Sequence, residues 1–327
     1  MRKKFCIKDI GEVDLIKRIS RDIKSKNALI GVGDDAAVIN ISGKYLLWTT
    51  DTLVENDHFS FKWFTPVQVG KKSMESNVSD IAAMGGIPKY ALVSLCLREN
   101  TPVGFVDGLY RGICSVAKKY GFEIVGGNIT HGSEISITVS MLGETSQENL
   151  RLRSGAKTGD FVCVTGHLGK SSAGLSLLIK EKKGYIKPYL EPKARLKEAQ
   201  IISQFANAMI DVSDGLASEI RHICDMSKKG AVIFKEKIPI SRHTTKAGKI
   251  LGKDPIDFAL YGGEDFELVF TISEKNLRKL KKQFKNFSVV GRILPRNRGI
   301  YMVSNGKKIK LGDGYDHFKS NINDSHK

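Results

Sequence analysis

The chain has 327 residues, of which 41% are hydrophobic and 27% are charged, which is typical of a globular protein and long enough for two domains. Lysine and arginine number 52 against 35 acidic residues, and five scattered cysteines form no CxxC pair, which argues against a disulfide framework and a zinc site. Apolar stretches such as 90–97 have the length of a strand and fall far short of a membrane span, and the first residues lack the apolar segment of a secretory signal. We therefore expect a cytoplasmic protein that does not cross a membrane.

The first part of the chain alternates between predicted helices and strands. Aliphatic residues at helical spacing indicate a short helix around 13–23, and 45–50 has the pattern of a buried strand. Two Thr-Pro pairs predict the starts of long helices, one from Thr65 to Gly85 and one from Thr101 to Gly121. Further strands are predicted at 90–97, 122–127 and 135–144.

A polar segment at 145–160 has the composition of a domain junction. We place the boundary near residue 148, which gives an amino-terminal domain of residues 1–148 and a carboxy-terminal domain of residues 149–327. Strands and helices alternate again after it, and the lysines of 274–287 are predicted to form the solvated face of an amphipathic helix. The alternation predicts a layered α/β architecture. The predicted strands of this part are 161–166, 231–234, 266–272, 287–293 and 299–303.

The formal net charge of +17 leaves two interpretations open. A basic surface can bind nucleic acid, but this would require clustered lysine and arginine together with aromatic residues for base stacking. The lysines are instead scattered, and the aromatic residues, 8% of the chain, follow the spacing of a core. We favour a general surface excess and expect no nucleic-acid partner.

Five short motifs combine acidic residues with Gly, Ser or Thr. Carboxylates and hydroxyls without His or Cys partners are hard oxygen ligands, which suit Mg²⁺ rather than zinc. Because protein-bound Mg²⁺ is usually shared with substrate phosphates, the motifs suggest nucleotide chemistry. Asp34 and Asp35 are adjacent, and neighbouring carboxylates repel each other unless a cation or donors lie between them. The motifs are GDD (33–35), TTDT (49–52), NVSDIAAMGG (77–86), DVSDG (211–215) and GGED (262–265).

Two of these five motifs, taken alone, also have an ordinary structural explanation. GDD fits a hydrogen-bonded turn, and DVSDG fits a helix capped by Ser213 with Asp214 in its first turn. Asp80 is harder to explain in this way, because a buried carboxylate in a helix of small apolar residues needs a cation or donors unless it faces solvent. GHLGKSS (166–172) is not a phosphate-binding P-loop, since Val164 stands where that motif requires glycine.

Taken together, the motifs run in order over nearly the whole chain and resemble those of the thiamine-monophosphate kinase family. That family is related to aminoimidazole ribonucleotide synthetase and selenophosphate synthetase. Eight matching segments in register make the resemblance specific, and the second and last of them favour the thiamine branch. The segments are GVGDDAAVI, TTDTLVENDHF, NVSDIAAMGGIPK, VGGNIT, RSGAKTGD, DVSDGL, YGGEDFEL and GYDHF.

The resemblance implies an enzyme that makes thiamine diphosphate from thiamine monophosphate and ATP by direct in-line phosphoryl transfer, with several Mg²⁺ ions and no phosphoenzyme. It implies a two-domain α/β (α+β) fold of the aminoimidazole ribonucleotide synthetase type, with mixed sheets flanked by helices. The amino-terminal domain would bind ATP and Mg²⁺ and would pair with its twin in a homodimer. A related ATP-dependent enzyme of the superfamily and a non-catalytic nucleotide-binding protein are the alternatives.

The resemblance also assigns roles to individual residues. Asp51, Asp80 and Asp211 would be the catalytic carboxylates, with Asp51 and Asp80 bridging ions, while Asp34 would shape the turn beside Asp35. The implied ATP contacts are Gly127, Asn128, Arg153 and Ser213, and the implied thiamine-phosphate contacts are His58, Glu264 and Tyr315. The implied metal ligands are Asp35, Thr49, Thr50, Asp51, Asp80, Asn128, Asp211 and Asp214.

Asn128 departs from the family pattern, which has aspartate at this position. An amide oxygen can coordinate Mg²⁺, but it brings no negative charge. We therefore expect a weaker ion at this position and a higher Mg²⁺ requirement than an aspartate would give.

Overall fold

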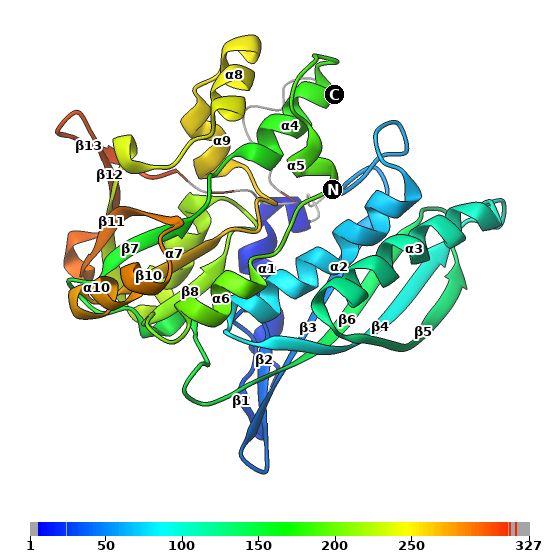
Figure 1. Cartoon of the computed structure of the whole chain (residues 1–327), viewed down its shortest axis with the longest axis horizontal. Helices are drawn as coiled ribbons and strands as arrows, with labels where there is room; N and C mark the ends of the chain where they lie inside the picture. Colours follow the sequence, from blue (N-terminus) through cyan, green and yellow to red (C-terminus); the bar gives the residue numbers. More distant parts are fainter. Residues whose placement is uncertain (1–5, 24, 313, 315–317, 319–327) are drawn as a thin grey trace, which may run out of the picture.

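The computed structural model describes residues 6–23, 25–312, 314 and 318, which build two β-sheets with helices packed on them (Figure 1). Six strands form the first sheet in the order β1-β2-β3-β6-β4-β5, and seven form the second in the order β13-β12-β9-β11-β7-β10-β8. Each sheet contains one parallel pair, β4 with β5 and β9 with β12, and its other pairs are antiparallel. The prediction of mixed sheets flanked by helices is confirmed.

The first sheet and its helices follow the predicted order. The strands predicted at 45–50, 90–97, 122–127 and 135–144 are present as β3 to β6, and the three predicted helices as α1 to α3. The short strands β1 and β2 were not predicted. The bounds are α1 (Glu12–Ser20), β1 (Ala28–Ile30), β2 (Ala37–Ile41), β3 (Lys44–Val54), α2 (Pro66–Ala83), β4 (Ile87–Leu97), α3 (Val103–Tyr120), β5 (Glu123–His131) and β6 (Ser136–Thr145).

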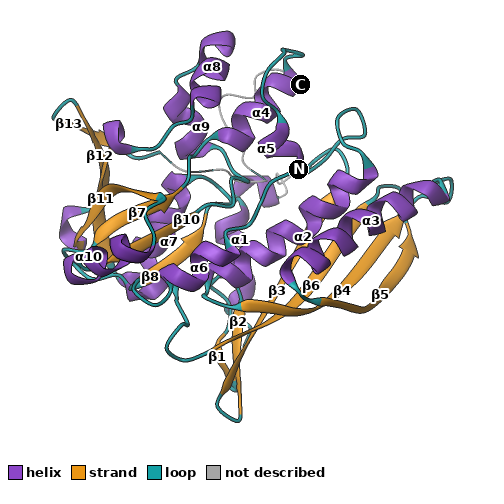
Figure 2. Ribbon diagram, viewed as in Figure 1, coloured by secondary structure: helices purple, strands orange, loops and turns teal. Residues whose placement is uncertain are grey.

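Helices α2 and α3 lie side by side over one face of the first sheet (Figure 2). They approach each other closely at two glycines. A Cβ atom on Gly70 would lie 2.1 Å from the carbonyl oxygen of Leu109, and one on Gly112 would lie 2.1 Å from that of Val67. Glycine at both positions therefore sets how deeply α2 and α3 pack together.

The opposite face of this sheet is open along β3, β6 and β4. Trp48 and Leu92 project from this open face and are 52% and 44% exposed. Because side chains alternate along a strand, β3 turns Trp48 and Thr50 to the open face and turns Thr49 and Asp51 toward α2. One face of β3 therefore contacts α2, and the other face is exposed.

The second sheet forms most of the rest of the chain. Its predicted strands are present as β7, β9, β10, β11 and β12, and the lysine-rich helix as α10, whereas the strands β8 and β13 were not predicted. The strands are β7 (Phe161–Thr165), β8 (Ala208–Asp211), β9 (Lys229–Phe234), β10 (Leu268–Ile272), β11 (Phe287–Pro295), β12 (Ile300–Ser304) and β13 (Lys307–Lys310). The helices are α4 (Lys170–Ile179), α5 (Lys187–Leu190), α6 (Leu196–Ile202), α7 (Leu216–Ser227), α8 (Arg242–Leu251), α9 (Pro255–Tyr261) and α10 (Glu274–Gln283).

Helix α2 lies between the two sheets and is packed against both parts of the chain (Figure 1). Helices α5 and α6 come from the later part of the chain but contact α2, and one hydrophobic core includes Val78 of α2, Ile202 of α6 and Phe270 of β10. The last strand of the first sheet ends at Thr145 and the first strand of the second begins at Phe161. The boundary near residue 148 falls between these strands and stays a prediction.

No helix among the described residues is both long enough and apolar enough to cross a membrane. All five cysteines lie in the described part of the chain and are free thiols. The cytoplasmic location stays a prediction.

Candidate active site

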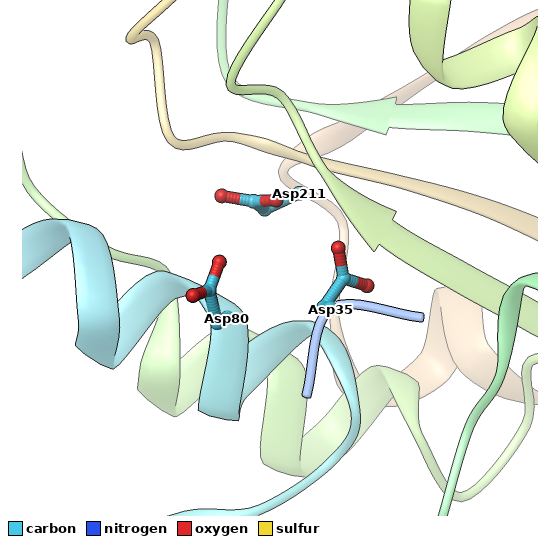
Figure 3. Close-up of side chains that lie close together, drawn as sticks. All are labelled: Asp35, Asp80 and Asp211. Atoms are coloured by element: carbon cyan, nitrogen blue, oxygen red, sulfur yellow. The ribbon is translucent and has the colours of Figure 1, made fainter. Parts of the chain in front are cut away.

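Three aspartates that are far apart in the sequence converge beside α2 (Figure 3). Asp35 lies in the loop between β1 and β2, Asp80 lies in the last turn of α2, and Asp211 ends β8. One carboxylate oxygen of each lies within 4.8 Å of one from each of the others. The structure thus brings together three of the residues that the sequence suggested as metal ligands.

Two hydroxyl groups orient Asp80 and Asp211. Thr49 Oγ1 donates a hydrogen bond to Asp80 Oδ2 at 2.6 Å, and Ser79 Oγ donates one to Asp211 Oδ2 at 2.6 Å. Thr49 belongs to the first sheet, whereas Asp211 belongs to the second. The pair of bonds therefore connects α2 to a strand of each sheet and determines where the two carboxylates point.

Asp51 lies next to this group on β3 and is half-buried. Its carboxylate accepts a hydrogen bond from the side chain of Ser76 on α2. Thr50, the neighbour of Asp51, is on the open face, where its hydroxyl donates to the carbonyl oxygen of Val139. The structure therefore places Asp51, but not the Thr50 side chain, beside the other carboxylates. We call Asp35, Asp51, Asp80 and Asp211 the aspartate cluster.

Arg153 meets the cluster through Asp35 and its neighbour. Arg153 Nη2 lies 2.5 Å from Asp35 Oδ1, and the Arg153 backbone N–H donates to the Asp34 carboxylate at 3.2 Å. The other oxygen of Asp35, Oδ2, is buried without a hydrogen-bond partner. A bare buried acceptor is destabilising unless a cation or donor meets it. The residues of the cluster therefore fit a divalent metal ion.

Burial and mutual repulsion perturb the acidity of these carboxylates. Burial raises the pKa of Asp211 to about 8, and the charge of Asp35 adds to the effect. Burial and then Asp35 also raise the pKa of Asp34 to about 7, although Arg153 opposes the change. The pKa of Asp80 lies well above its ordinary value, first because of burial and then because of neighbouring aspartates. A bound cation would reverse these effects, since it favours the ionised form.

The DVSDG motif begins at the last residue of β8 and continues as a loop, rather than forming a capped helix start. Helix α7 begins at Leu216 with Gly215 as its N-cap residue and without a side-chain cap, so the interpretation of Ser213 as a cap is wrong. Gly215 has a φ of 98°, a conformation that keeps Ser213 and Asp214 outside the helix. The Asp214 backbone N–H donates to Glu219, a buried carboxylate that is 1% exposed. Glu219 was not predicted as a site residue, because an acidic residue in the first turn of a helix is ordinary.

Two of the three residues implied to bind thiamine phosphate, His58 and Glu264, lie around Lys72 in the first half of α2. His58 follows β3, and its Nδ1 accepts a hydrogen bond from the Val54 backbone N–H at 3.2 Å. Glu264 lies between α9 and β10. Lys72 of α2 joins them, with its Nζ 2.6 Å from Glu264 Oε1 and 2.8 Å from the His58 carbonyl oxygen. Lys72 was not predicted as a site residue, and Tyr315 lies outside the described residues.

Gly127 and Asn128 lie on β5, at the edge of the first sheet. Strands β6 and β4 separate β5 from β3, a distance of about 14 Å at the usual strand spacing. Asn128 extends a row formed by Thr52, Thr138 and Ser94, which runs across the open face. Within one chain the structure does not bring Asn128 to the aspartate cluster.

The aspartate of the GGED motif has a structural role. The Asp265 carboxylate accepts hydrogen bonds from the backbone N–H groups of Gly169, Lys170 and Ser171 at the start of α4. These groups belong to GHLGKSS (166–172), the segment that lacks the glycine of a P-loop. A protein carboxylate thus occupies the helix terminus that a P-loop would offer to a phosphate.

Comparison with known proteins identifies the family. The model of the AIR synthase related protein N-terminal domain matches residues 33–145, and that of the C-terminal domain matches residues 157–304. A thiamine-monophosphate kinase of Aquifex aeolicus (strain VF5) is 38% identical over 319 residues, which cover 95% of this chain and 99% of that protein. The chain belongs to the thiamine-monophosphate kinase family.

Further relatives of this family agree in sequence and in structure. A thiamine-monophosphate kinase of Buchnera aphidicola subsp. Schizaphis graminum is 39% identical over 311 residues, which cover 90% of this chain and 94% of that protein. The structure of AaThiL complexed with AMPPCP and TMP matches with a TM-score of 0.85 at 37% identity and covers 96% of this chain and 99% of that one. The predicted family and fold class are confirmed.

Proposed function

We propose that this chain transfers the γ-phosphoryl group of ATP to thiamine monophosphate, with Mg²⁺ held by the aspartate cluster. As a member of the thiamine-monophosphate kinase family, the chain is an ATP-dependent kinase. AaThiL, its 37% identical relative, is complexed with AMPPCP and TMP. The observation that carries the metal role is Asp35 Oδ2, which is buried without a hydrogen-bond partner in a group of carboxylates.

The chemistry explains why such a cluster is useful. Phosphoryl transfer depends on charge neutralisation and an in-line approach more than on covalent help. Mg²⁺ supplies this neutralisation when two anionic substrates meet. The chain's own contribution is placement, because the cluster draws its members from both sheets and from α2 between them. The attacking phosphate oxygen is largely ionised at neutral pH, so the residues need not include a general base.

The remaining roles follow from the family resemblance and from the placement of Arg153. The Nε of Arg153 is buried without a hydrogen-bond partner and lies 3.9 Å from Asp34 Oδ1, so the guanidinium retains a donor that a phosphate oxygen could use. We assign ATP binding to Gly127, Asn128, Arg153 and Ser213, and thiamine phosphate binding to His58, Glu264 and Tyr315. We assign metal binding to the aspartate cluster with Thr49, Asn128 and Asp214, and to Thr50 through its main chain only, because its side chain lies on the open face.

We further propose that two copies of the chain pair through the open face. This face exposes Trp48 and Leu92, apolar side chains that a partner would cover. It also carries Asn128, which cannot reach the aspartate cluster of its own chain. A site shared between two chains would bring Asn128 to the aspartate cluster of the other chain. Sedimentation should show a dimer that Trp48→Lys weakens, and a monomeric parent protein would refute the pairing.

A coupled ADP-release assay with thiamine monophosphate, with and without Mg²⁺, tests the function. We expect Mg²⁺-dependent ADP release with this substrate and none with aminoimidazole precursors, which a related superfamily enzyme would use. Nucleotide binding without ADP release would favour the non-catalytic alternative. Asp51→Asn and Asp80→Asn should lower turnover at least about 100-fold while the circular dichroism spectrum stays unchanged. Asp107→Asn, an exposed aspartate on α3, is the control and should retain parental turnover.

A further inference from the structure

Lys72 is a lysine without any exposed surface. It lies on α2, where residues four positions apart share a stripe of the helix. Ser76, which donates to Asp51, is one turn further on, and Asp80 is two turns further on. The same stripe of α2 thus holds Lys72, which contacts Glu264, and Asp80, which belongs to the aspartate cluster. The two residues are about 12 Å apart along the helix axis.

The ammonium group of Lys72 is fully engaged within the protein. It lies 2.6 Å from Glu264 Oε1 and donates to the His58 carbonyl oxygen at 2.8 Å. The rings of Tyr189 and Phe64 flank it, with their centroids 4.4 Å and 5.3 Å from Nζ. An ammonium has three N–H donors, and these contacts leave no side of it facing a ligand. Lys72 therefore acts on a substrate only through the groups that it holds.

Burying the ammonium group of Lys72 destabilises the folded protein unless the Glu264 carboxylate is beside it. Burial lowers the pKa of Lys72, and the Glu264 carboxylate opposes this effect. Breaking a buried pair by removing one member leaves an uncompensated charge, which is strongly destabilising, whereas removing both members is much better tolerated. The buried position of Lys72 therefore depends on Glu264, and Lys72 in turn restrains the Glu264 carboxylate.

Glu264 is held in an unusual backbone conformation next to the cluster. Its φ is 62°, in the left-handed region, and its backbone N–H donates to the Ser213 carbonyl oxygen at 2.8 Å. Its charge contributes to the raised pKa of Asp51, after burial, so the two carboxylates are close. The Lys72 ammonium draws the Glu264 carboxylate to α2 and fixes its distance from the metal ligands.

We propose that Lys72 is a positioning residue that sets the affinity for thiamine monophosphate by holding Glu264. This inference rests on the proposed function, which assigns Glu264 to the thiamine phosphate side. Lys72 belongs to the first part of the chain and Glu264 to the later part, so the pair also joins the two sides of the substrate site. ATP binding, which we assign to other residues, does not depend on this pair.

Steady-state kinetics of Lys72→Met test this role. Methionine keeps the apolar stem and removes the charge, so Glu264 is no longer held. We expect the KM for thiamine monophosphate to rise about 10-fold to 100-fold, the KM for ATP to stay within about twofold, and kcat to fall less than about threefold. The matched control is Lys119→Met, since Lys119 of α3 pairs with Glu75 of α2 at 2.7 Å and lies over the ring of Tyr120. It should leave both KM values unchanged.

A double variant separates positioning from a general loss of stability. If Lys72 acts through Glu264, adding Lys72→Met to Glu264→Gln should change the KM for thiamine monophosphate by less than about twofold. The double variant also lacks a lone buried charge, so it serves if Lys72→Met alone does not fold. A further tenfold rise in the double variant would overturn the proposal. So would an unchanged KM for thiamine monophosphate in a folded Lys72→Met protein.

The parent protein distinguishes the two levels of inference. A parent that releases no ADP with thiamine monophosphate refutes the proposed function and the role of Lys72 with it. If the parent is active and Lys72→Met raises the KM values for thiamine monophosphate and ATP equally, the proposed function holds and only the positioning role is refuted.

Discussion

Raising the pH from 6 to 8 should tighten Mg²⁺ binding to the metal-free protein at least about fiftyfold, because Asp211 alone contributes this factor and the other carboxylates with a raised pKa add to it. Burial and Asp35 raise the pKa of Asp211 to about 8, so this carboxylate carries a proton at pH 6 that Mg²⁺ must displace. Competition by one such proton weakens the apparent affinity about 100-fold at pH 6 but only about twofold at pH 8. The ratio corresponds to about 2.3 kcal/mol of binding free energy.

The stability of the metal-free protein should change in the opposite direction. The folded state retains a proton on Asp211 up to a pH of about 8, whereas in the unfolded chain the same carboxyl has its ordinary value of 3.8. The unfolded state therefore binds fewer protons between these values, and the free energy of unfolding falls as the pH rises through this window. Saturating Mg²⁺ should restore more stability at pH 8 than at pH 6.

Calorimetric titration of Mg²⁺ into the metal-free protein measures the affinity and the number of protons released at each pH. At pH 7 binding should release about 0.9 proton from Asp211, which appears as a dependence of the observed heat on the ionisation enthalpy of the buffer. Asp211→Asn should remove this proton release and weaken binding. An apparent affinity that changes less than about threefold between pH 6 and pH 8, with no buffer dependence, would refute the reasoning.

Three further predictions concern single side chains. Asn128→Asp should lower the Mg²⁺ concentration for half-maximal turnover, because a carboxylate adds charge, and superimposable Mg²⁺ titrations would contradict this. In urea unfolding, Gly112→Ala should cost at least about 2 kcal/mol because its Cβ would meet backbone of α2 at 2.1 Å, whereas Gly104→Ala, with nothing within 4 Å, should stabilise by about 0.5 kcal/mol. Equal effects would disprove the close approach. Asp265→Ala should cost about 3 kcal/mol, since three backbone N–H groups at the start of α4 lose their acceptor, against about 1 kcal/mol for Ser241→Ala, which removes one backbone cap bond of α8 and a bond with the hydroxyl of Thr244. A smaller loss for Asp265→Ala would contradict its role as a cap.

The limits of the long helices could be predicted because their signals are local. Thr65 caps α2 by accepting a hydrogen bond from the Gln68 backbone N–H, and Pro66 occupies the first turn. Gly121 ends α3 in the left-handed conformation with a φ of 74°. Such signals involve only neighbours in the chain, so they act in any tertiary setting. The short strands β1, β2, β8 and β13 carry no comparable signal, because pairing with longer strands defines them.

The kind of site could also be predicted from residue types alone. Carboxylates next to hydroxyls and glycines, without histidine or cysteine ligands, indicate a divalent cation whatever the fold. The tertiary structure alone decided that Ser79 places Asp211 beside Asp80, that Asn128 lies on the open face, and that Lys72 holds Glu264. These contacts depend on how α2 packs between the two sheets. The spacing of residues along the chain does not show which distant segments the packing brings together.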